Sequence, residues 1–312
     1  MSKIKVGVAG VGHMGREHAR IYSALPSAEL VGVYDADRET GRKIAQHHGC
    51  KLFGSLEEMI GEVEAASIAT PTSSHFELAQ AFLGKGRHLL LEKPITNTTA
   101  EATRLVELAR QNNLVLQVGH IERFNPVLKA LEERLTHPRF IEAHRLSPYP
   151  GRSTDIGVVM DLMIHDLEII LHIVRSPVAS VDAVGVPVLS KAEDIANARI
   201  RFENGCVANI TTSRISPDKM RKIRVFQDDA YLSLDYQKQE GEIYRKHGGQ
   251  ITRERIPVAK DEPLKRQLES FVHCVATRSA PVVSGDHATE ALKLAARVVE
   301  LIESQSIVPA LA

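Results

Sequence analysis

The stretch Ile4-Lys-Val-Gly-Val-Ala-Gly10-Val-Gly12-His-Met-Gly15 decides the fold of the N-terminal part of the chain. It places the pattern GxGxxG directly after a short apolar run and before an amphipathic pattern of helical period. In that setting Gly10 permits a tight turn, Gly12 lets a pyrophosphate approach the backbone, and Gly15 lets helix and strand pack closely. The helix N-terminus, with His13 and Met14 in its first turn, offers N–H groups and partial positive charge to the phosphates.

An acidic residue follows the second apolar run. Asp35 lies 20 residues after Gly15, the distance typical of the ribose-binding carboxylate of dinucleotide-binding domains. A carboxylate there accepts hydrogen bonds from the ribose hydroxyls and repels a 2′-phosphate, so the sequence predicts NAD as the cofactor. The nearby Arg38 is compatible with a 2′-phosphate, which leaves NADP as the less favoured alternative. A tight structural turn with a solvated Asp35 is disfavoured because glycines, strand, helix and acid agree.

The first part of the chain alternates short apolar runs with amphipathic helical patterns. This alternation predicts an α/β Rossmann domain, a doubly wound parallel sheet with right-handed crossovers, over residues 1–120. The expected strands are 4–9, 30–34, 66–69, 88–91 and 114–118, and the expected helices are 14–25, 38–47, 73–83 and 99–111.

Beyond residue 120 the pattern changes to strands that follow one another. We expect an α+β domain over residues 121–312, with a large, mostly antiparallel open sheet and helices on one face. Asn204-Gly205 predicts a type I′ hairpin, and the last helix, 286–303, is placed where it can pack back on the first domain. The other expected helices are 126–135, 158–174 and 264–277, and the strands are 140–147, 181–188, 196–203, 206–213, 220–227 and 231–235.

Composition argues against several classes of function. Lys plus Arg and Asp plus Glu both number 39 in 312 residues, so no basic excess exists to drive nucleic-acid binding. The most apolar stretch, Ile156 to Val174, is interrupted by charged residues and is not expected to enter a membrane. The three cysteines lie far apart without a CxxC pair, which favours a reducing cytoplasm over a disulfide framework.

Glu92-Lys93-Pro94 closes a predicted strand of the parallel sheet. Ligands of such sheets bind beyond the carboxyl ends of the strands, so Lys93 is expected to face the cofactor crevice. Proline after it restricts the lysine backbone. An exposed lysine at a strand end, without function, explains this tripeptide equally well.

Asp161 and His165 lie four residues apart on a predicted helix and therefore share a face. Burial lowers a histidine pKa and a neighbouring carboxylate raises it, so this imidazole is tunable near neutral pH and suited to take a hydroxyl proton. The alternatives are a core histidine satisfied by the aspartate, and a metal site. Two ligands without a third are weak support for a metal, and we expect none.

Taken together, these residues resemble the Gfo/Idh/MocA oxidoreductase family over nearly the whole chain. The resemblance implies a tightly bound nicotinamide cofactor and a homodimer or homotetramer associated through the C-terminal sheet. It implies that Lys93 contacts nicotinamide ribose and reacting oxygen, that His165 is the general acid/base, and that Asp161 orients it or binds substrate. Its markers include the lining of the nicotinamide half: Thr70, Pro71, His75 and Glu92.

Within that family the chain is similar to the subgroup that oxidises the 3-hydroxyl of UDP-N-acetylglucosamine. The similarity lies in 117–126, 145–152 and 161–166. It implies that Arg123, Arg145 and Arg152 bind substrate, since arginine suits phosphate geometry; surface arginines or salt bridges at the domain junction are the alternative. The chain departs from the family pattern around Asp161, where the usual glycines are missing, and at Glu168, which replaces a common aspartate.

The sequence therefore predicts an NAD-dependent dehydrogenase of a sugar or sugar nucleotide. Three alternatives stay open: a dehydrogenase of a free sugar or an inositol-like polyol, a relative that uses NAD transiently without net redox change, and a nucleotide-dependent sensor without catalysis. The presence of Lys93, Asp161 and His165 disfavours the sensor, because a protein that only binds does not need them.

Overall fold

The computed structural model describes residues 3–149 and 156–306. Its contacts divide the chain into two compact units, Met1–Arg123 with Glu262–Thr289, and Phe124–Asp261 with Glu290–Ala312. From the sequence we expected a single boundary at residue 120 and placed 262–289 in the second domain. In the structure this segment groups with the first unit, because its helix buries apolar side chains in the core of that unit.

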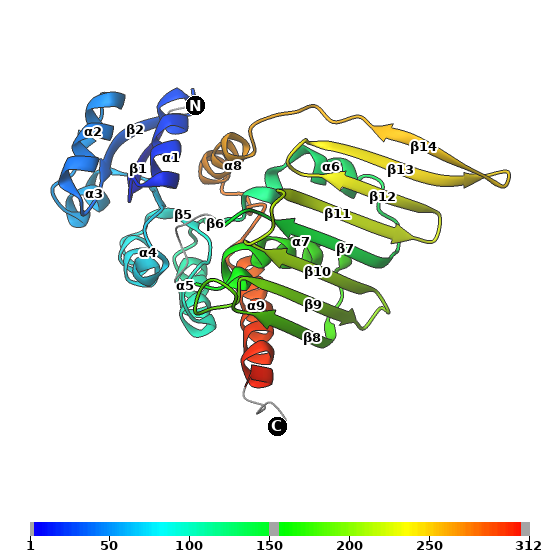
Figure 1. Ribbon diagram of the computed structural model, residues 1–312. Coiled ribbons are helices and arrows are strands. Elements are labelled where there is room, and N and C mark those ends of the chain that lie inside the picture. The colour runs from blue at the N-terminus through cyan, green and yellow to red at the C-terminus, as the bar shows by residue number, and fades with distance from the viewer. Residues whose placement is uncertain (1–2, 150–155, 307–312) are drawn as a thin grey trace. The chain divides into compact units, whose positions relative to one another are not determined.

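The first unit contains a six-stranded parallel sheet in the order β3-β2-β1-β4-β5-β6 (Figure 1). This is the strand order of a dinucleotide-binding doubly wound sheet, so the predicted Rossmann fold is confirmed. β4 and β5 are buried throughout, as their apolar runs require. The strands are β1 (Ile4–Ala9), β2 (Ala28–Tyr34), β3 (Lys51–Leu52), β4 (Ala65–Ile68), β5 (His88–Glu92) and β6 (Leu116–Gly119).

Several helices of this unit begin at side-chain caps. Asp37, Ser55 and Thr98 each accept hydrogen bonds from the N–H groups of the turn that follows, and Thr98 forms a capping box with Glu101. β3 and α3 were not predicted, because two and seven residues leave too short a periodic pattern. The helices are α1 (His13–Ala24), α2 (Arg38–His48), α3 (Leu56–Glu62), α4 (His75–Gly84), α5 (Thr99–Gln111) and α8 (Pro263–Thr277), with a 3-10 turn, η1, at Thr72–Ser74.

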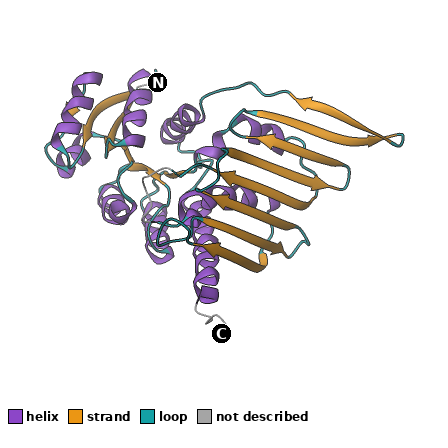
Figure 2. Ribbon diagram, in the orientation of Figure 1, coloured by secondary structure: helices purple, strands orange, loops and turns teal. Residues whose placement is uncertain are grey.

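The second unit contains an eight-stranded sheet in the order β14-β13-β12-β11-β7-β10-β9-β8 (Figure 2). Its neighbours are antiparallel except β7 and β10, which run parallel, so the predicted mostly antiparallel sheet is confirmed. The strands are β7 (Pro138–Leu146), β8 (Val178–Val186), β9 (Ile195–Phe202), β10 (Val207–Ser213), β11 (Met220–Gln227), β12 (Ala230–Asp235), β13 (Glu240–His247) and β14 (Gln250–Ile256).

The helices of the second unit cover one face of this sheet (Figure 1). They are α6 (Pro126–Glu132), α7 (Ile164–Val174) and the part of α9 (Gly285–Ser306) that belongs to this unit. The strands bury alternate residues against them, as in β9, where Ala196, Ala198 and Ile200 are buried. None of the helices in the described parts of the chain is long and apolar enough to cross a membrane.

Two local predictions for the sheet need correction. β13 and β14 were not predicted, because their outer positions are mostly polar and six of the seven residues of β14 are exposed, which removes the apolar alternation. The hairpin at Asn204-Gly205 is present, but it is not type I′. Only Gly205 of the pair has positive φ, +85°, and its N–H donates to the carbonyl of Phe202 at 3.0 Å. A type I′ turn needs positive φ at both central residues, whereas here only Gly205 has the left-handed backbone conformation.

The core of the first unit predicts a stability test of α8. Phe271 is fully buried in the same cluster as Val6 and Val8 of β1. We expect Phe271→Ala to lower the free energy of unfolding by about 3–5 kcal/mol, because it removes a buried ring and leaves a cavity. Urea-induced unfolding followed by circular dichroism measures this. His273→Ala, on the exposed side of the same helix, is the control, and equal losses for both variants would contradict the assignment of α8 to this core.

Candidate active site

The glycine turn after β1 has the geometry that its pattern predicts. Gly10 has φ +80°, and a Cβ there would lie 2.7 Å from the Thr70 side chain. A Cβ on Gly15 would lie 1.7 Å from the carbonyl oxygen of Gly10, so only glycine lets α1 start this close to β1. A Cβ on Gly12 would meet no atom within 4 Å. The backbone at Gly12 is therefore open to a ligand.

The N-terminus of α1 leaves its first N–H groups uncapped by side chains. Gly12 is the N-cap residue without a side-chain hydrogen bond, and the first turn contains no acidic residue. His13 is exposed and Met14 is half-buried at this end of the helix. N–H groups and helix dipole together make such an end an anion site. These residues fit the pyrophosphate of a dinucleotide.

Asp35 is fixed beside this turn by two backbone hydrogen bonds. Its Oδ2 accepts the N–H of Val11 at 2.7 Å, and its Oδ1 accepts the N–H of Asp37 at 2.8 Å. A half-buried carboxylate held at the end of β2 suits the ribose hydroxyls of NAD. The Arg38 guanidinium donates to the carbonyl of Phe53. The cation that would accommodate a 2′-phosphate is thus engaged by the protein backbone.

His75 joins the ends of two neighbouring strands. Its Nδ1 and Nε2 each lie 2.9 Å from a carbonyl oxygen, of Pro94 and Thr70 respectively. Burial lowers the pKa of this imidazole, although both carbonyl contacts oppose the shift. The ring therefore acts as a brace between the loops after β4 and β5. Thr70 is half-buried and accepts a hydrogen bond from Ser74 at 2.8 Å, while Pro71 is exposed.

The ends of β5 and β6 meet at a buried carboxylate. Glu92 is 8% exposed, and its Oε1 lies 3.2 Å from Nε2 of the fully buried His18. A Cβ on Gly119 would lie 2.4 Å from the same Oε1. Glycine at the end of β6 is therefore what makes room for this acid. Lys93 follows directly and is half-buried.

His120 is a buried histidine that was not predicted from the sequence as a site residue. It follows Gly119 at the carboxyl end of β6 and is 1% exposed. Burial lowers its pKa to about 3, and the positive charges of Lys93 and Arg123 contribute to the shift. Lys93, His120 and Arg123 thus form a cluster at the carboxyl ends of β5 and β6, in which the imidazole is neutral. The position of a histidine directly after a strand-ending glycine was the available signal.

In the second unit, Asp161 and His165 lie on a helix that begins with a π-turn. The π-turn spans Val159–Met163 and continues into α7, whereas the sequence predicted one α-helix from residue 158. Asp161 is in the π-turn, and its N–H donates to the carbonyl of Gly157 at 3.1 Å. Both side chains are half-buried. π-turns are rare in proteins, and those that occur are often found at functional sites. This fits the predicted role of the segment.

The three predicted substrate arginines differ in their surroundings. Arg145 of β7 is buried and forms a bidentate pair with Asp166, with Nε–Oδ2 and Nη2–Oδ1 distances of 2.7 and 2.9 Å. This pair ties α7 to the sheet one residue after His165. Arg123 is half-buried in a 3-10 turn at Ile121–Phe124. Arg152 lies outside the described residues.

The buried His120 predicts a pH dependence of stability. Its pKa is about 3 in the folded chain and near 6.5 in an unfolded one, so between these values only the unfolded state binds the proton. Stability therefore falls as the pH falls from 6.5. We expect His120→Gln to flatten the decline between pH 6 and 4 by up to about 1.4 kcal/mol per pH unit, measured by urea unfolding. An unchanged slope would contradict a neutral buried imidazole.

Comparison with known proteins identifies the family. The model described as oxidoreductase family, NAD-binding Rossmann fold, matches residues 4–120, and the GFO/IDH/MocA C-terminal domain matches residues 131–233. The chain is 36% identical, over 97% of its length and 99% of the relative's, to UDP-N-acetylglucosamine 3-dehydrogenase of Acidithiobacillus ferrooxidans. A solved structure of that enzyme matches with a TM-score of 0.93 at 37% identity, covering 97% of this chain and 99% of that chain.

More distant relatives act on other alcohols. Myo-inositol 2-dehydrogenase of Thermotoga maritima is 25% identical over 93% of this chain and 94% of its own length. Sequence similarity over almost the whole chain, both domain models and the dinucleotide-binding geometry agree. The chain therefore belongs to the Gfo/Idh/MocA family and is an NAD-dependent oxidoreductase.

Proposed function

We propose that the chain oxidises the 3-hydroxyl of UDP-N-acetylglucosamine to a ketone. The observation that carries the proposal is the 36% identity to a dehydrogenase of that substrate over 97% of this chain. Lys93, Asp161 and His165 are the residues to which we assign the chemistry. When bound, NAD supplies the hydride acceptor, and the protein supplies binding, orientation and electrostatics.

Each polar group has a defined task in this proposal. The N–H groups at the start of α1 bind the pyrophosphate, and Asp35 accepts hydrogen bonds from the adenosine ribose. His165 takes the proton of the substrate hydroxyl, and Asp161 orients the imidazole or the sugar. The ammonium group of Lys93 stabilises the negative charge that develops on the same oxygen.

The arginines receive different tasks. Arg123 belongs to the cationic cluster with Lys93. Of the two predicted arginines that the structure describes, it is the one that we assign to the substrate diphosphate. Arg152 keeps the role expected from the sequence. Arg145 acts through Asp166, because a guanidinium that is 4% exposed and bidentately paired holds α7 in place.

Activity measurements test the substrate and the base together. Purified protein with NAD, UDP-N-acetylglucosamine and a ketone trap is expected to form NADH, while free glucose and UDP-glucose are expected to give little. His165→Ala should lower kcat by about 10²–10⁴-fold, because proton transfer is lost, and leave NAD binding intact. The control is His172→Ala, which removes another imidazole of α7, one that pairs with Glu132 at the end of α6.

The possible outcomes separate the alternatives. Turnover of myo-inositol instead of the sugar nucleotide would keep the mechanism and replace the substrate. Substrate conversion without net NADH would favour transient use of NAD, and NAD binding without any turnover would favour a sensor. Full NADH formation by the His165 variant would disprove its assignment as the base.

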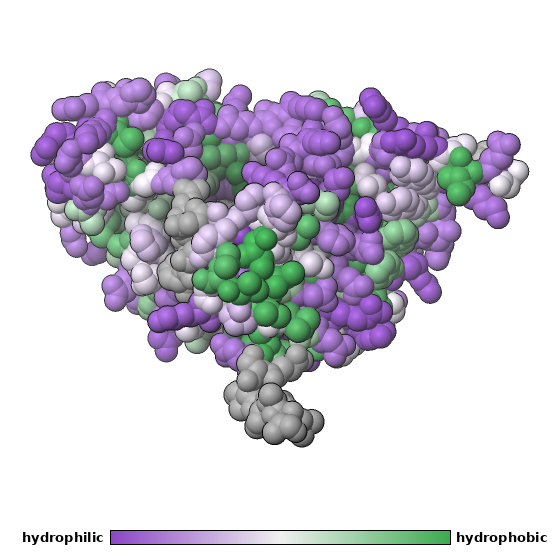
Figure 3. Space-filling model, viewed as in Figure 1, coloured by the Kyte–Doolittle hydropathy of each residue, from purple (hydrophilic) through white to green (hydrophobic). Residues whose placement is uncertain are grey.

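We also propose that two or four copies associate through the sheet of the second unit. The face opposite α7 carries a row of half-buried aromatic rings. The ring centroids of Phe226 and Tyr231 lie 4.6 Å apart, and those of Tyr231 and Tyr244 lie 5.0 Å apart, in stacked arrangements. Val184 and Val186 are about half exposed on the same face, and apolar side chains gather in the lower middle of the surface in Figure 3. Apolar surface of this kind marks an association site.

Light scattering after size exclusion tests the association. The mass is expected to be two or four times the 34.4 kDa of one chain. Introducing charge with the double change Val184→Glu and Val186→Glu should lower it toward one chain. Val282→Glu, at an exposed apolar residue of the first unit, is the control. A monomeric protein, or an unchanged mass in the double variant, would contradict this interface.

The three free cysteines support a reducing cytoplasmic location.

A further inference from the structure

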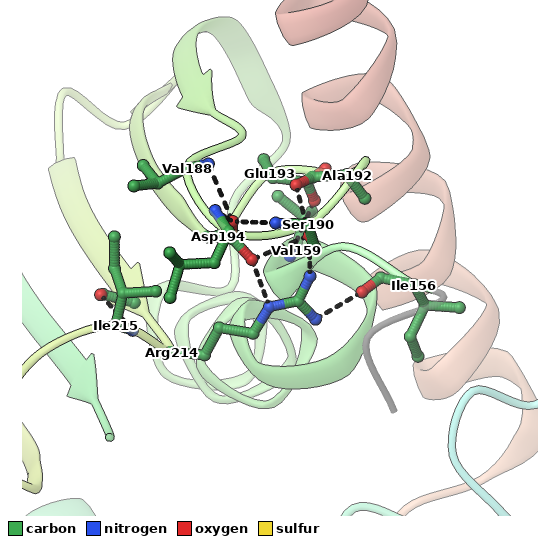
Figure 4. Close-up of polar contacts among 11 residues, drawn as sticks. Ile156, Val159, Val188, Ser190, Ala192, Glu193, Asp194, Arg214 and Ile215 are labelled. Carbon is green, nitrogen blue, oxygen red and sulfur yellow. Dashed lines mark hydrogen bonds and ion pairs between the residues drawn. The ribbon is translucent and has the colours of Figure 1, made fainter. Parts of the chain in front are cut away.

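A buried ion pair holds the loop between β8 and β9 next to the start of the π-turn (Figure 4). Arg214 is 1% exposed and Asp194 is fully buried, and Nε of the arginine donates to Oδ1 of the aspartate at 2.7 Å. Oδ2 of Asp194 accepts the N–H groups of Val188, Leu189 and Ser190 at 2.5–2.9 Å. The pair therefore fixes the backbone of this loop at residues 188–190.

The same arginine reaches the segment that leads into the π-turn. Its Nη1 donates to the carbonyl of Ile156 at 2.7 Å, and its Nη2 donates to Ser190 Oγ at 2.7 Å. Ile156 directly precedes Gly157, whose carbonyl accepts the N–H of Asp161. Arg214 thus connects the loop to the backbone segment that precedes Asp161 and accepts its N–H.

Glu193 caps the π-turn from this loop. Its Oε1 accepts the N–H of Val159 at 3.1 Å, and its carbonyl oxygen accepts the N–H of Val158 at 3.0 Å (Figure 4). Val158, the N-cap residue, supplies no side-chain hydrogen bond of its own. A Cβ on Gly157 would lie 1.9 Å from the Glu193 carboxylate, so glycine is what lets the acid approach. The N–H groups at this helix start are therefore satisfied by a segment distant in sequence.

We propose that Glu193, supported by the Asp194–Arg214 pair, is a positioning residue that sets the orientation of Asp161 for substrate. This inference rests on the proposed function. The cap acts on the first residues of the π-turn, whereas α7 is held independently by buried apolar residues and by Arg145 with Asp166. Loss of the cap should therefore misplace Asp161 without unfolding the helix. Displacements of about 1 Å at a reacting group can lower rates by about 10²-fold.

Paired variants of Glu193 test this role. Glu193→Ala removes the acceptor of the Val159 N–H, while Glu193→Gln keeps a side-chain oxygen at the same place. We expect Glu193→Ala to lower kcat by about 10–10²-fold with unchanged NAD affinity and melting temperature, and Glu193→Gln to retain most of the activity. Glu203→Ala, at an exposed glutamate in the β9–β10 turn, should behave as the unchanged protein.

Hydrogen exchange gives a second readout that needs no substrate. The amides of Val158, Val159 and Asp161 should exchange faster in Glu193→Ala than in Glu193→Gln, with α7 unaffected. Unchanged exchange and unchanged kcat in the alanine variant would overturn the proposal, as would equal loss of activity, NAD affinity and melting temperature. If the unaltered protein oxidised no alcohol, the proposed function would fail, and the exchange comparison would still decide whether Glu193 holds the π-turn.

Discussion

The close approach of α1 to β1 is the constraint on which the first unit depends. Gly15 lies so near the carbonyl of Gly10 that any side chain would collide with it. This contact fixes the helix N-terminus at the carboxyl end of β1, and the parallel order of the sheet brings the ends of β4, β5 and β6 to the same edge. Thr70, Lys93 and His120 follow those strands, so three loops of the chain meet where a dinucleotide binds.

Much of this unit could be predicted because its signals are local. Three glycines, an acid 20 residues later, short apolar runs and amphipathic helical patterns can each be read from a short stretch of sequence. The sheet of the second unit was recognised only where its strands alternate apolar and polar residues. β13 and β14 lack that alternation, since Ile251 is 78% exposed while the residues beside it are polar. Strands that bury little against helices leave no periodic trace.

The sequence indicates candidate residues for the site, and it does not indicate the partners that those residues have in the fold. Arg145 is of a residue type that suits a diphosphate, and nothing local reveals that Asp166, 21 residues away, accepts two hydrogen bonds from one edge of its guanidinium. His75 similarly bridges Thr70 and Pro94, a contact that depends on the neighbouring strands β4 and β5. The π-turn around Asp161 was missed because its residues fit an α-helical pattern. Its cap comes from Glu193, which lies 34 residues beyond Val159 in the chain.

Two buried arginine–carboxylate pairs lie beside the helix that carries His165. Their desolvation cost indicates that they serve to orient this helix rather than to stabilise the fold. Desolvation of such a pair consumes most of its Coulombic attraction, so apolar residues of similar volume would stabilise the fold equally well. The pairs instead fix the orientation of the segments that they join. Arg145 fixes α7 to β7 through two parallel hydrogen bonds, and Arg214 fixes the approach to the π-turn through the carbonyl of Ile156. A helix whose approach and first turn are each held by a planar guanidinium group has little freedom to rotate there, which is the property that a proton-transferring imidazole requires.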